Sequence, residues 1–248
     1  MPATPAWPPR SAPRLFVSDP VSEGVPITLD AEQAHYLSRV MRVGEGDAVI
    51  VCDNMTGEWA TRVTVAGKRN VMLEPVEKLR DREEVPDLWL CPALLKKDRF
   101  DLVLEKATEL GVARICPVVT RRCVADKLNH DRVSRIVTEA AEQCARTALP
   151  GVEEPVKIEA FLKALPADRA LFFADELGGE PAAEVFKTRG TPAAILIGPE
   201  GGFDDAEREA IRAHPRAKPI TLGPRILRGE TAALAAVSLW MGTMGDWQ

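Results

Sequence analysis

The stretch 195-ILIGPEGGFDDAERE-209 predicts the fold class of this chain. An apolar run leads into a Gly-Pro-Glu-Gly-Gly turn, and an acidic segment that favours helix follows directly. A buried strand that turns at once into a helix is the repeating unit of a parallel α/β sheet, whose ligands bind at the carboxyl ends of the strands. Asp204 and Glu207 have the spacing of a capping box, so we expect the helix to begin there. The stretch predicts an α/β domain with a binding site at its glycines, where a ligand can approach the backbone.

The second half of the chain repeats this pattern. The apolar runs LWLCPALL, RICPVV, ALFFAD and PITLG alternate with helical patterns, which is typical of a mostly parallel sheet covered on both faces. We expect RFDLVLEKATELGV to be a helix that ends at Gly111, and HDRVSRIVTEAAEQCARTALPG to be one that Pro150 and Gly151 stop. The expected buried positions are Phe100, Val103, Ala107 and Leu110 in the first helix, and Val133, Ile136, Val137, Ala140, Ala141 and Cys144 in the second.

The first part of the chain is expected to form a separate, small β-rich domain. The segments RLFV, AVIVC, EWATRVTVA and NVMLEPV combine β-forming residues between turn signals, which predicts a barrel over residues 14–77. Residues 1–13 are rich in proline and are expected to form a flexible, mobile arm. The charge-rich residues 78–87 are the expected linker, and the α/β domain then takes residues 88–248.

One helix is expected in the β-rich part, in the segment DAEQAHYLSRVMRV, with Asp30 as its cap. The residues expected on the face that packs on the barrel are Leu37, Val40 and Met41. A basic face carries His35, Arg39 and Arg42. That basic face is either a solvated surface or a place for a negatively charged partner.

The composition limits the function classes. The chain has 32 basic and 37 acidic residues and a formal net charge of −5, so any RNA site must be a local patch. No apolar run is long enough to cross a bilayer, and the N-terminus lacks a secretion signal pattern, so a cytoplasmic location is expected. The cysteines are scattered without a C-x-x-C pair, which argues against a disulfide framework and a zinc site and predicts reduced, mostly buried thiols.

A second strand end with glycine occurs in 221-TLGPRILRGETAALAAVSLW-240, where two arginines flank Ile226 and Leu227 before an alanine-rich helix. Two such strand ends in the last quarter of the chain indicate one shared pocket. It is not a phosphate loop, because the Gly-Lys-Ser/Thr ending is absent, nor a dinucleotide site, because no G-x-G-x-x-G occurs there. The three histidines stand in no catalytic motif, so covalent or metal-dependent hydrolysis is disfavoured and no metal is expected.

The segments LIGPEGGF and LGPRILRGETA together resemble two signature motifs of the SPOUT class of S-adenosylmethionine-dependent RNA methyltransferases. More narrowly, the chain is similar to the ribosomal RNA small subunit methyltransferase E family, which methylates N3 of one uridine in 16S ribosomal RNA. The resemblance runs from Arg14 onward through RLFV, HYLSRVMRVGEGD, KKDRFDLVLEKATELGV and EAAEQCARTALP. It implies a PUA-like, RNA-binding β-barrel followed by a SPOUT-type α/β methyltransferase domain that contains a trefoil knot and forms a homodimer.

The resemblance also implies site residues. The implied walls of the pocket for S-adenosylmethionine are Leu196, Gly198, Pro199, Glu200, Gly201 and Gly202 on one side, and Leu222, Gly223, Ile226, Leu227 and Arg228 on the other. Glu200 suits a ligand that carries a sulfonium and an ammonium rather than phosphates. The residues expected to contact 16S ribosomal RNA in the small subunit or its precursor are Arg14, His35, Arg39, Arg42, Lys96, Lys97, Arg99 and Arg146.

The expected chemistry follows from the substrate. Uracil N3 is a weak acid between two carbonyls, so methylation requires loss of its proton or stabilisation of the imide anion. We expect Arg225 or Arg228 to stabilise the developing oxyanion, with Glu230 orienting the arginine. Two departures from the family pattern stand at the helix end: Ala145 replaces the usual glycine, and Ala148 or Leu149 a commonly basic position. The alternatives are a SPOUT enzyme that methylates the ribose 2′-hydroxyl and a catalytically silent RNA-binding module for ribosome assembly.

Overall fold

The computed structural model describes residues 7–67 and 69–247. The chain forms two compact units, of which the first comprises the residues up to Glu84 together with Ala141–Ala148. The second comprises Val85–Ala140 and the chain from Leu149 onward. Each unit has a hydrophobic core of its own.

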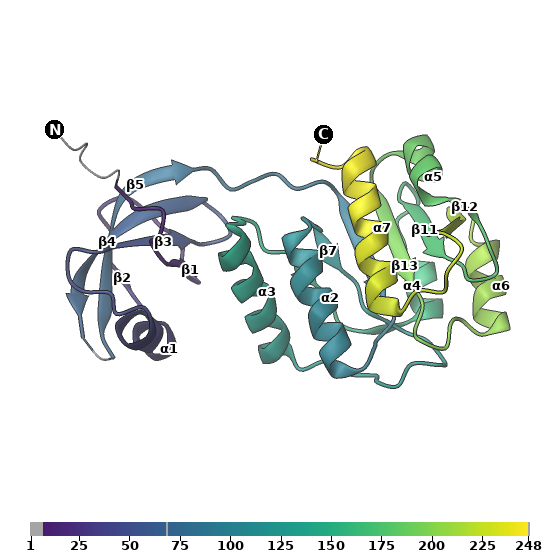
Figure 1. The fold of residues 1–248 in the computed structure, drawn as a ribbon, viewed down its shortest axis with the longest axis horizontal. Coiled ribbons are helices and arrows are strands. Elements are labelled where there is room, and N and C mark those ends of the chain that lie inside the picture. Colours follow the sequence, from purple (N-terminus) through teal and green to yellow (C-terminus); the bar gives the residue numbers. More distant parts are fainter. Residues whose placement is uncertain (1–6, 68, 248) are drawn as a thin grey trace. The chain divides into compact units, whose positions relative to one another are not determined.

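The first unit is built on a five-stranded mixed sheet with the order β1-β3-β4-β5-β2 (Figure 1). The pair β1 and β3 is parallel, and the other pairs are antiparallel. The strands are β1 (Arg14–Phe16), β2 (Ile27–Thr28), β3 (Ala48–Cys52), β4 (Glu58–Ala66) and β5 (Val71–Arg80). The four predicted β segments are therefore confirmed. The two-residue strand β2 was not predicted, because so short a segment carries no periodicity.

The predicted start of the helix in this unit is confirmed, but its predicted end is wrong. Asp30 caps α1 (Ala31–His35) by accepting a hydrogen bond from the Gln33 N–H at 2.8 Å. The chain then continues as a π-helix, η1 (Tyr36–Val40), rather than as α-helix. The wider turn changes the angular phase of the last residues, so Leu37 is buried as expected but Val40 is 62% exposed and Met41 40% exposed.

The segments expected to be an arm and a linker have ordered parts. Residues 1–6 of the arm lie outside the described residues, and the Arg62 guanidinium lies 5.2 Å from the centroid of the Trp7 ring. Strand β5 extends to Arg80, so the first three residues of the expected linker, 78–80, are β-structure. Residues 81–87 carry no regular secondary structure.

The second unit is organised around a seven-stranded sheet in which all pairs are parallel, as predicted. The strand order is β12-β14-β11-β13-β6-β7-β9. Its strands are β6 (Leu88–Pro92), β7 (Arg114–Ile115), β9 (Gly151–Val152), β11 (Ala170–Ala174), β12 (Glu180–Pro181), β13 (Ala193–Ile197) and β14 (Ala217–Thr221). A separate parallel pair joins β8 (Val118–Val119) to β10 (Val156–Lys157).

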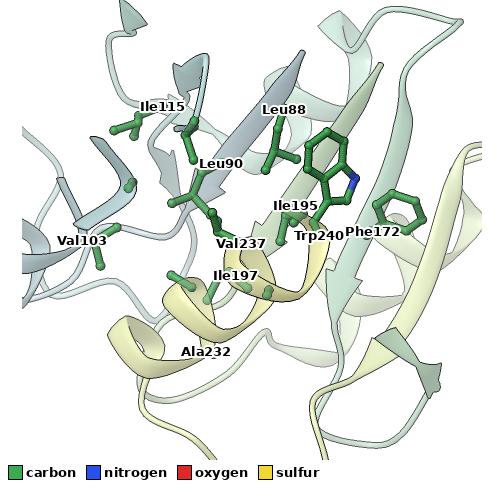
Figure 2. Close-up of a cluster of buried hydrophobic side chains, with 14 of the residues drawn as sticks. Leu88, Leu90, Val103, Ile115, Phe172, Ile195, Ile197, Ala232, Val237 and Trp240 are labelled. Atoms are coloured by element: carbon green, nitrogen blue, oxygen red, sulfur yellow. The ribbon is translucent and has the colours of Figure 1, made fainter. Parts of the chain in front are cut away.

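Helices cover both faces of this sheet, because successive residues of each buried strand point to opposite sides. On β13, Ile195 and Ile197 enter the core that contains Trp240 of α7 (Figure 2), whereas Leu196 enters the core on the other face. The first face also receives α2, α3 and α5, and the second receives α4 and α6. The helices are α2 (Lys97–Glu109), α3 (His130–Cys144), α4 (Ile158–Ala164), α5 (Ala182–Arg189), α6 (Asp205–Ala213) and α7 (Gly229–Met244).

The predicted helix RFDLVLEKATELGV is confirmed as α2, but the predicted end of α3 is wrong. Helix α3 ends at Cys144 because Ala145 adopts a positive φ of 61°. The Arg146 N–H then donates to the Ala141 carbonyl at 2.9 Å, which is the long-range bond of a Schellman motif. The departure from glycine noted in the sequence thus falls at the one position of this helix end where glycine is favoured.

The segment Ala141–Ala148 is held within the first unit by hydrogen bonds. The Phe16 N–H donates to Glu142 Oε1 at 2.8 Å. Glu83 Oε1 accepts from the backbone N–H groups of Thr147 and Ala148 at 2.8 and 3.0 Å. The residues of the motif EAAEQCARTALP from Ala141 to Ala148 are therefore part of the β-rich unit.

Replacing Ala145 by glycine is expected to stabilise the protein. A left-handed conformation costs an L-residue about 1–2 kcal/mol, and the greater freedom of glycine in the unfolded chain offsets about 0.4–1 kcal/mol of the gain. We expect Ala145→Gly to raise the free energy of unfolding by about 0.5–1 kcal/mol in urea denaturation followed by circular dichroism. The matched control is Ala141→Gly inside α3, which should lower it. A loss of stability in both variants would contradict this account of the helix end.

Candidate functional site

A cavity of about 180 Å³ opens in the second unit at the carboxyl ends of three adjacent strands. Ala174 ends β11, Ile197 ends β13, and Ile220 lies near the end of β14; all three line the cavity. The loops that follow these strands and the start of α7 complete the wall. Both glycine-bearing strand ends singled out in the sequence thus meet at one pocket.

The first loop, after β13, is shaped by close packing around its glycines. A Cβ on Gly198 would lie 3.1 Å from the Phe203 ring. Gly202 has a positive φ of 68°, and a Cβ there would lie 2.5 Å from Glu176 Oε1. Glycine is favoured at Gly202 by its positive φ, and a side chain at either position would require the Glu176 carboxylate or the Phe203 ring to shift.

The loop ends in the predicted capping box, which is confirmed. The Glu207 N–H donates to Asp204 Oδ1 at 2.7 Å, and the Asp204 N–H donates to Glu207 Oε2 at 3.1 Å. The bond from the Glu207 N–H, together with the Arg121 guanidinium, lowers the pKa of the Asp204 carboxyl. The start of α6 is thereby fixed relative to the cavity.

Two arginines that were not predicted from the sequence form hydrogen bonds to the loop after β13 and to the start of α6. Arg121 donates through its backbone N–H to Glu207 Oε1 at 2.7 Å and through its guanidinium to Asp204 Oδ2 at 2.8 Å. Arg122 Nη1 donates to the Gly201 carbonyl at 2.6 Å. Both arginines follow β8, so their place after a strand end was the available signal.

A third group of lining residues follows β11 and was also missed. The Asp175 side chain is fully buried and binds Arg212 Nη2 at 2.6 Å and Arg208 Nε at 3.2 Å. Arg208, whose side chain is only 9% exposed, also donates to Glu176 Oε1 at 2.7 Å. Glu176 stays 43% exposed and lines the cavity. The two acids stand directly after the buried run ALFFA, which is where the strand-end rule would have placed ligand-binding residues.

Glu200 lines the cavity and is part of a three-residue charge cluster. Arg99 Nη1 of α2 lies 3.3 Å from Glu200 Oε1 and 3.9 Å from Glu230 Oε1 at the start of α7. Glu230 Oε2 is buried and has no hydrogen-bond partner among the described residues. The charge of Glu200 is therefore balanced by Arg99, and Glu230 pairs with Arg99 rather than with the two arginines that the sequence analysis assigned to it.

The second loop, after β14, places most of its predicted residues at the cavity. Leu222, Gly223, Arg225, Ile226 and Leu227 line it, and Ile226 is 91% exposed. An isoleucine so exposed at the mouth of a cavity is available to cover a bound ligand. Gly223 has a φ of 114°, which only glycine adopts readily.

Three residues of the predicted cofactor walls do not line the cavity. Leu196 is fully buried on the opposite face of the sheet, because side chains alternate along β13, and Ile197 takes the place at the cavity. Gly201 lies on the outer side of its loop, where Arg122 binds its carbonyl. Arg228 is exposed as the residue that caps α7.

The predicted RNA-binding residues differ in their exposure and in whether they form ion pairs within the protein. Arg146 has a side chain only 4% exposed and lies 3.6 Å from Glu83, so its guanidinium is not available to a phosphate. Arg14 forms an ion pair with Glu58, and burial lowers the pKa of Arg14. Arg99 is partly buried and pairs with Glu200. The other five predicted residues are exposed, and none of them forms an ion pair with another described residue. They are His35, Arg39 and Arg42 in the first unit and Lys96 and Lys97 in the second.

Cys52, Cys91 and Cys116 are buried and all five cysteines are free, as predicted. Burial raises the pKa of Cys52 to about 11, so this thiol is protonated at neutral pH. Within residues 7–67 and 69–247, no group of three or more His, Cys, Asp or Glu side chains has the arrangement of a metal site, and no helix has the length and apolarity to cross a membrane.

Comparison with known proteins gives consistent matches over both units. A family model for an RNA methyltransferase domain matches residues 82–241, and one for an RNA methyltransferase PUA domain matches residues 29–76. The chain is 30% identical to ribosomal RNA small subunit methyltransferase E of Rickettsia conorii over 91% of its own length and 93% of the relative. The protein of the same name from Synechocystis is 33% identical, with 91% and 76% covered.

A solved structure extends the match to the fold. The crystal structure of a ribosomal RNA small subunit methyltransferase E from Neisseria gonorrhoeae, bound to S-adenosyl methionine, has a TM-score of 0.87 to this chain at 27% identity. The match covers 96% of this chain and 100% of that one. A PUA-like unit followed by a SPOUT-type α/β unit is thus the fold of the chain, as the sequence predicted.

Proposed function

The chain belongs to the ribosomal RNA small subunit methyltransferase E family, and from this we propose that it transfers a methyl group from S-adenosylmethionine to N3 of one uridine in 16S ribosomal RNA. The observation that supports the proposal most is the cavity itself. Both family motifs meet there, at the carboxyl ends of adjacent parallel strands.

The lining of the cavity fits S-adenosylmethionine. Ile197, Ile220 and Leu222 offer an apolar surface to an adenine ring, and the glycine-bearing loops leave backbone groups open to its edge. Glu176 and Glu200 add carboxylates that suit the ribose hydroxyls and the cationic end of this ligand.

The bound cofactor would supply an electrophilic methyl group. The chain's own part is to hold the ligand and to stabilise the uracil imide anion as N3 loses its proton to water and takes up the methyl group. We assign the second role to Arg228 or Arg225. Both residues are exposed; Arg225 lines the cavity, and Arg228 directly follows the lining residue Leu227. Positioning of the reacting groups by the two loops supplies a further share of the rate.

The role that we propose for Glu230 differs from the one predicted from the sequence. Its ion partner is Arg99, which also binds Glu200 of the other motif. We therefore propose that Arg99 links the two loops and that Glu230 positions Arg99. This arrangement would keep the start of α7 and the loop after β13 together when a ligand enters.

Assembly and location belong to the same proposal. Helices α2 and α7 pack on each other, and each exposes a large apolar side chain, Leu102 at 37% and Leu239 at 39%. We propose that these two residues belong to the interface of the homodimer that the family resemblance implies. The proposal also includes a trefoil knot in the α/β unit, a role in ribosome biogenesis and a cytoplasmic location.

The proposal is tested by methyl transfer to RNA. Purified protein is incubated with radiolabelled S-adenosylmethionine and small ribosomal subunits, either lacking base methylation or fully methylated. We expect acid-precipitable label in the RNA of the unmethylated subunits alone. Binding of S-adenosylmethionine without any label in either RNA would leave a binding module and overturn the enzymatic assignment.

A further inference from the structure

Three large apolar side chains are exposed together at the end of the helix in the first unit. Tyr36 is 39% exposed, Val40 62% and Met41 40%. Two residues of the same helical segment, Ala34 and Leu37, are fully buried in the core of the unit. The exposure is therefore not a sign of a loosely packed helix, since the side facing the core is tightly covered.

The π-helical turn accounts for this exposure. The Met41 N–H donates to the Tyr36 carbonyl at 3.1 Å, a bond that spans five residues, so Tyr36 and Met41 lie one wide turn apart. In a regular α-helix, Val40 and Met41 would share the buried face of Leu37. Such turns are frequent at functional sites, because they cost stability relative to the α-helix.

The turn ends in a second unfavourable feature. Arg42 has a positive φ of 56°, a conformation that is unfavourable for a residue with a side chain. Its side chain is exposed and forms no ion pair with any described residue. Backbone conformations of this kind cluster at binding sites, and this one places a cation beside the exposed apolar residues.

Basic side chains accompany the exposed apolar residues. His35, Arg39 and Arg42 are exposed and have no ion pair within the described part of the chain, and exposed acids stand before and after them in the sequence, Glu32 in α1 and Glu45 after Arg42. Asp30 is engaged as the helix cap. We name the set Tyr36, Arg39, Val40, Met41 and Arg42 the basic-apolar face.

We propose that the basic-apolar face binds an unpaired nucleotide of the RNA, with its base stacked on Tyr36 and its flanking phosphates on Arg39 and Arg42. An A-form duplex hides its base faces in the stack, so exposed tyrosine, valine and methionine side chains would gain nothing from it. A single-stranded segment offers base faces and phosphates together, which matches this combination of side chains. The inference rests on the proposed function, which makes RNA the substrate, and adds a preference for single-stranded RNA.

The test uses Tyr36, which is the one tyrosine of the sequence. Wild type, Tyr36→Ala and Tyr36→Phe are titrated into a fluorescently labelled single-stranded RNA and into the matching blunt duplex, over a series of salt concentrations. Loss of a stacked base costs about 1–3 kcal/mol, so Tyr36→Ala should weaken single-strand binding about 5- to 150-fold. Tyr36→Phe keeps the ring and should bind as wild type, and duplex binding should be the same for all three.

The arginines provide the matched control, because they act through charge. Arg39→Ala combined with Arg42→Ala should lower the slope of log affinity against log salt by about 1.4 for the single strand, whereas Tyr36→Ala should leave that slope unchanged. Equal losses on duplex and single strand, or none with Tyr36→Ala, would overturn the inference. A wild type that sediments as a larger species than Tyr36→Ala would assign the face to a second copy of the chain instead.

The outcome is independent of catalysis. Single-strand preference without methyl transfer would refute the proposed function and keep the basic-apolar face. Methyl transfer by a Tyr36→Ala variant with unaltered RNA affinity would refute the face and keep the function.

Discussion

Replacing Gly202 by valine is expected to weaken the binding of S-adenosylmethionine about 10- to 100-fold. Gly202 lines the cavity at a φ of 68°, where a β-branched residue is strongly disfavoured. Its Cβ would also lie 2.5 Å from Glu176 Oε1, so the carboxylate must leave its place beside Arg208. Both effects change the shape of the cavity at the wall that the ligand would contact.

Isothermal titration calorimetry with S-adenosylmethionine measures the effect directly. The matched control is Gly201→Ala, since that glycine does not line the cavity and its Cβ would meet only the flexible Arg122 side chain, at 3.3 Å. Gly201→Ala should bind within about threefold of wild type. An unchanged dissociation constant for a folded Gly202→Val variant would mean that the ligand does not occupy this cavity.

Replacing Arg228 by alanine is expected to lower the rate of methyl transfer by at least about tenfold. Removing one donor to a developing oxyanion typically costs about 10²–10³ in turnover, and tenfold is the lower bound if Arg225 compensates in part. Arg228 is exposed at the start of α7 and forms no side-chain cap bond, so its loss should leave the fold intact.

Single-turnover rates at saturating cofactor and RNA separate this role from binding. Arg228→Ala should reduce the rate constant with little change in either dissociation constant, because the interaction strengthens as charge develops. Arg216→Ala, another exposed arginine of the second unit, is the control and should transfer at the wild-type rate. If Arg225→Ala is slow and Arg228→Ala is not, the catalytic role passes to Arg225.

The sequence predicted the elements whose pattern is local. The strands before Gly198 and Gly223, the capping box at Asp204 and the helix α2 each depend on residues a few positions apart, and the structure confirms them. The predicted end of the helix that follows Asp30 was wrong because periodicity assumes 3.6 residues per turn. The single wider turn of η1 exposes Val40 and Met41, which were expected to be buried.

Contacts between segments that lie far apart in the chain could not be predicted from the sequence. The bonds from Arg122 to Gly201 and from Arg208 to Glu176 join residues 79 and 32 positions apart, and neither Arg122 nor Glu176 stands in a recognisable motif. Arg99 illustrates the same limit: its place in a basic run predicted RNA binding, whereas the fold pairs it with Glu200 after β13 and with Glu230 at the start of α7. Arg146 was likewise predicted at a surface and is buried beside Glu83.

The identity of the methylated nucleoside tests the central claim most directly. Small subunits lacking base methylation are labelled with radioactive S-adenosylmethionine and the protein, and the RNA is digested to nucleosides and separated by chromatography. The account predicts label in 3-methyluridine, at one equivalent per subunit. Label in a 2′-O-methylated nucleoside or in another base would contradict it, because the imide chemistry assigned to the arginines would then have no substrate.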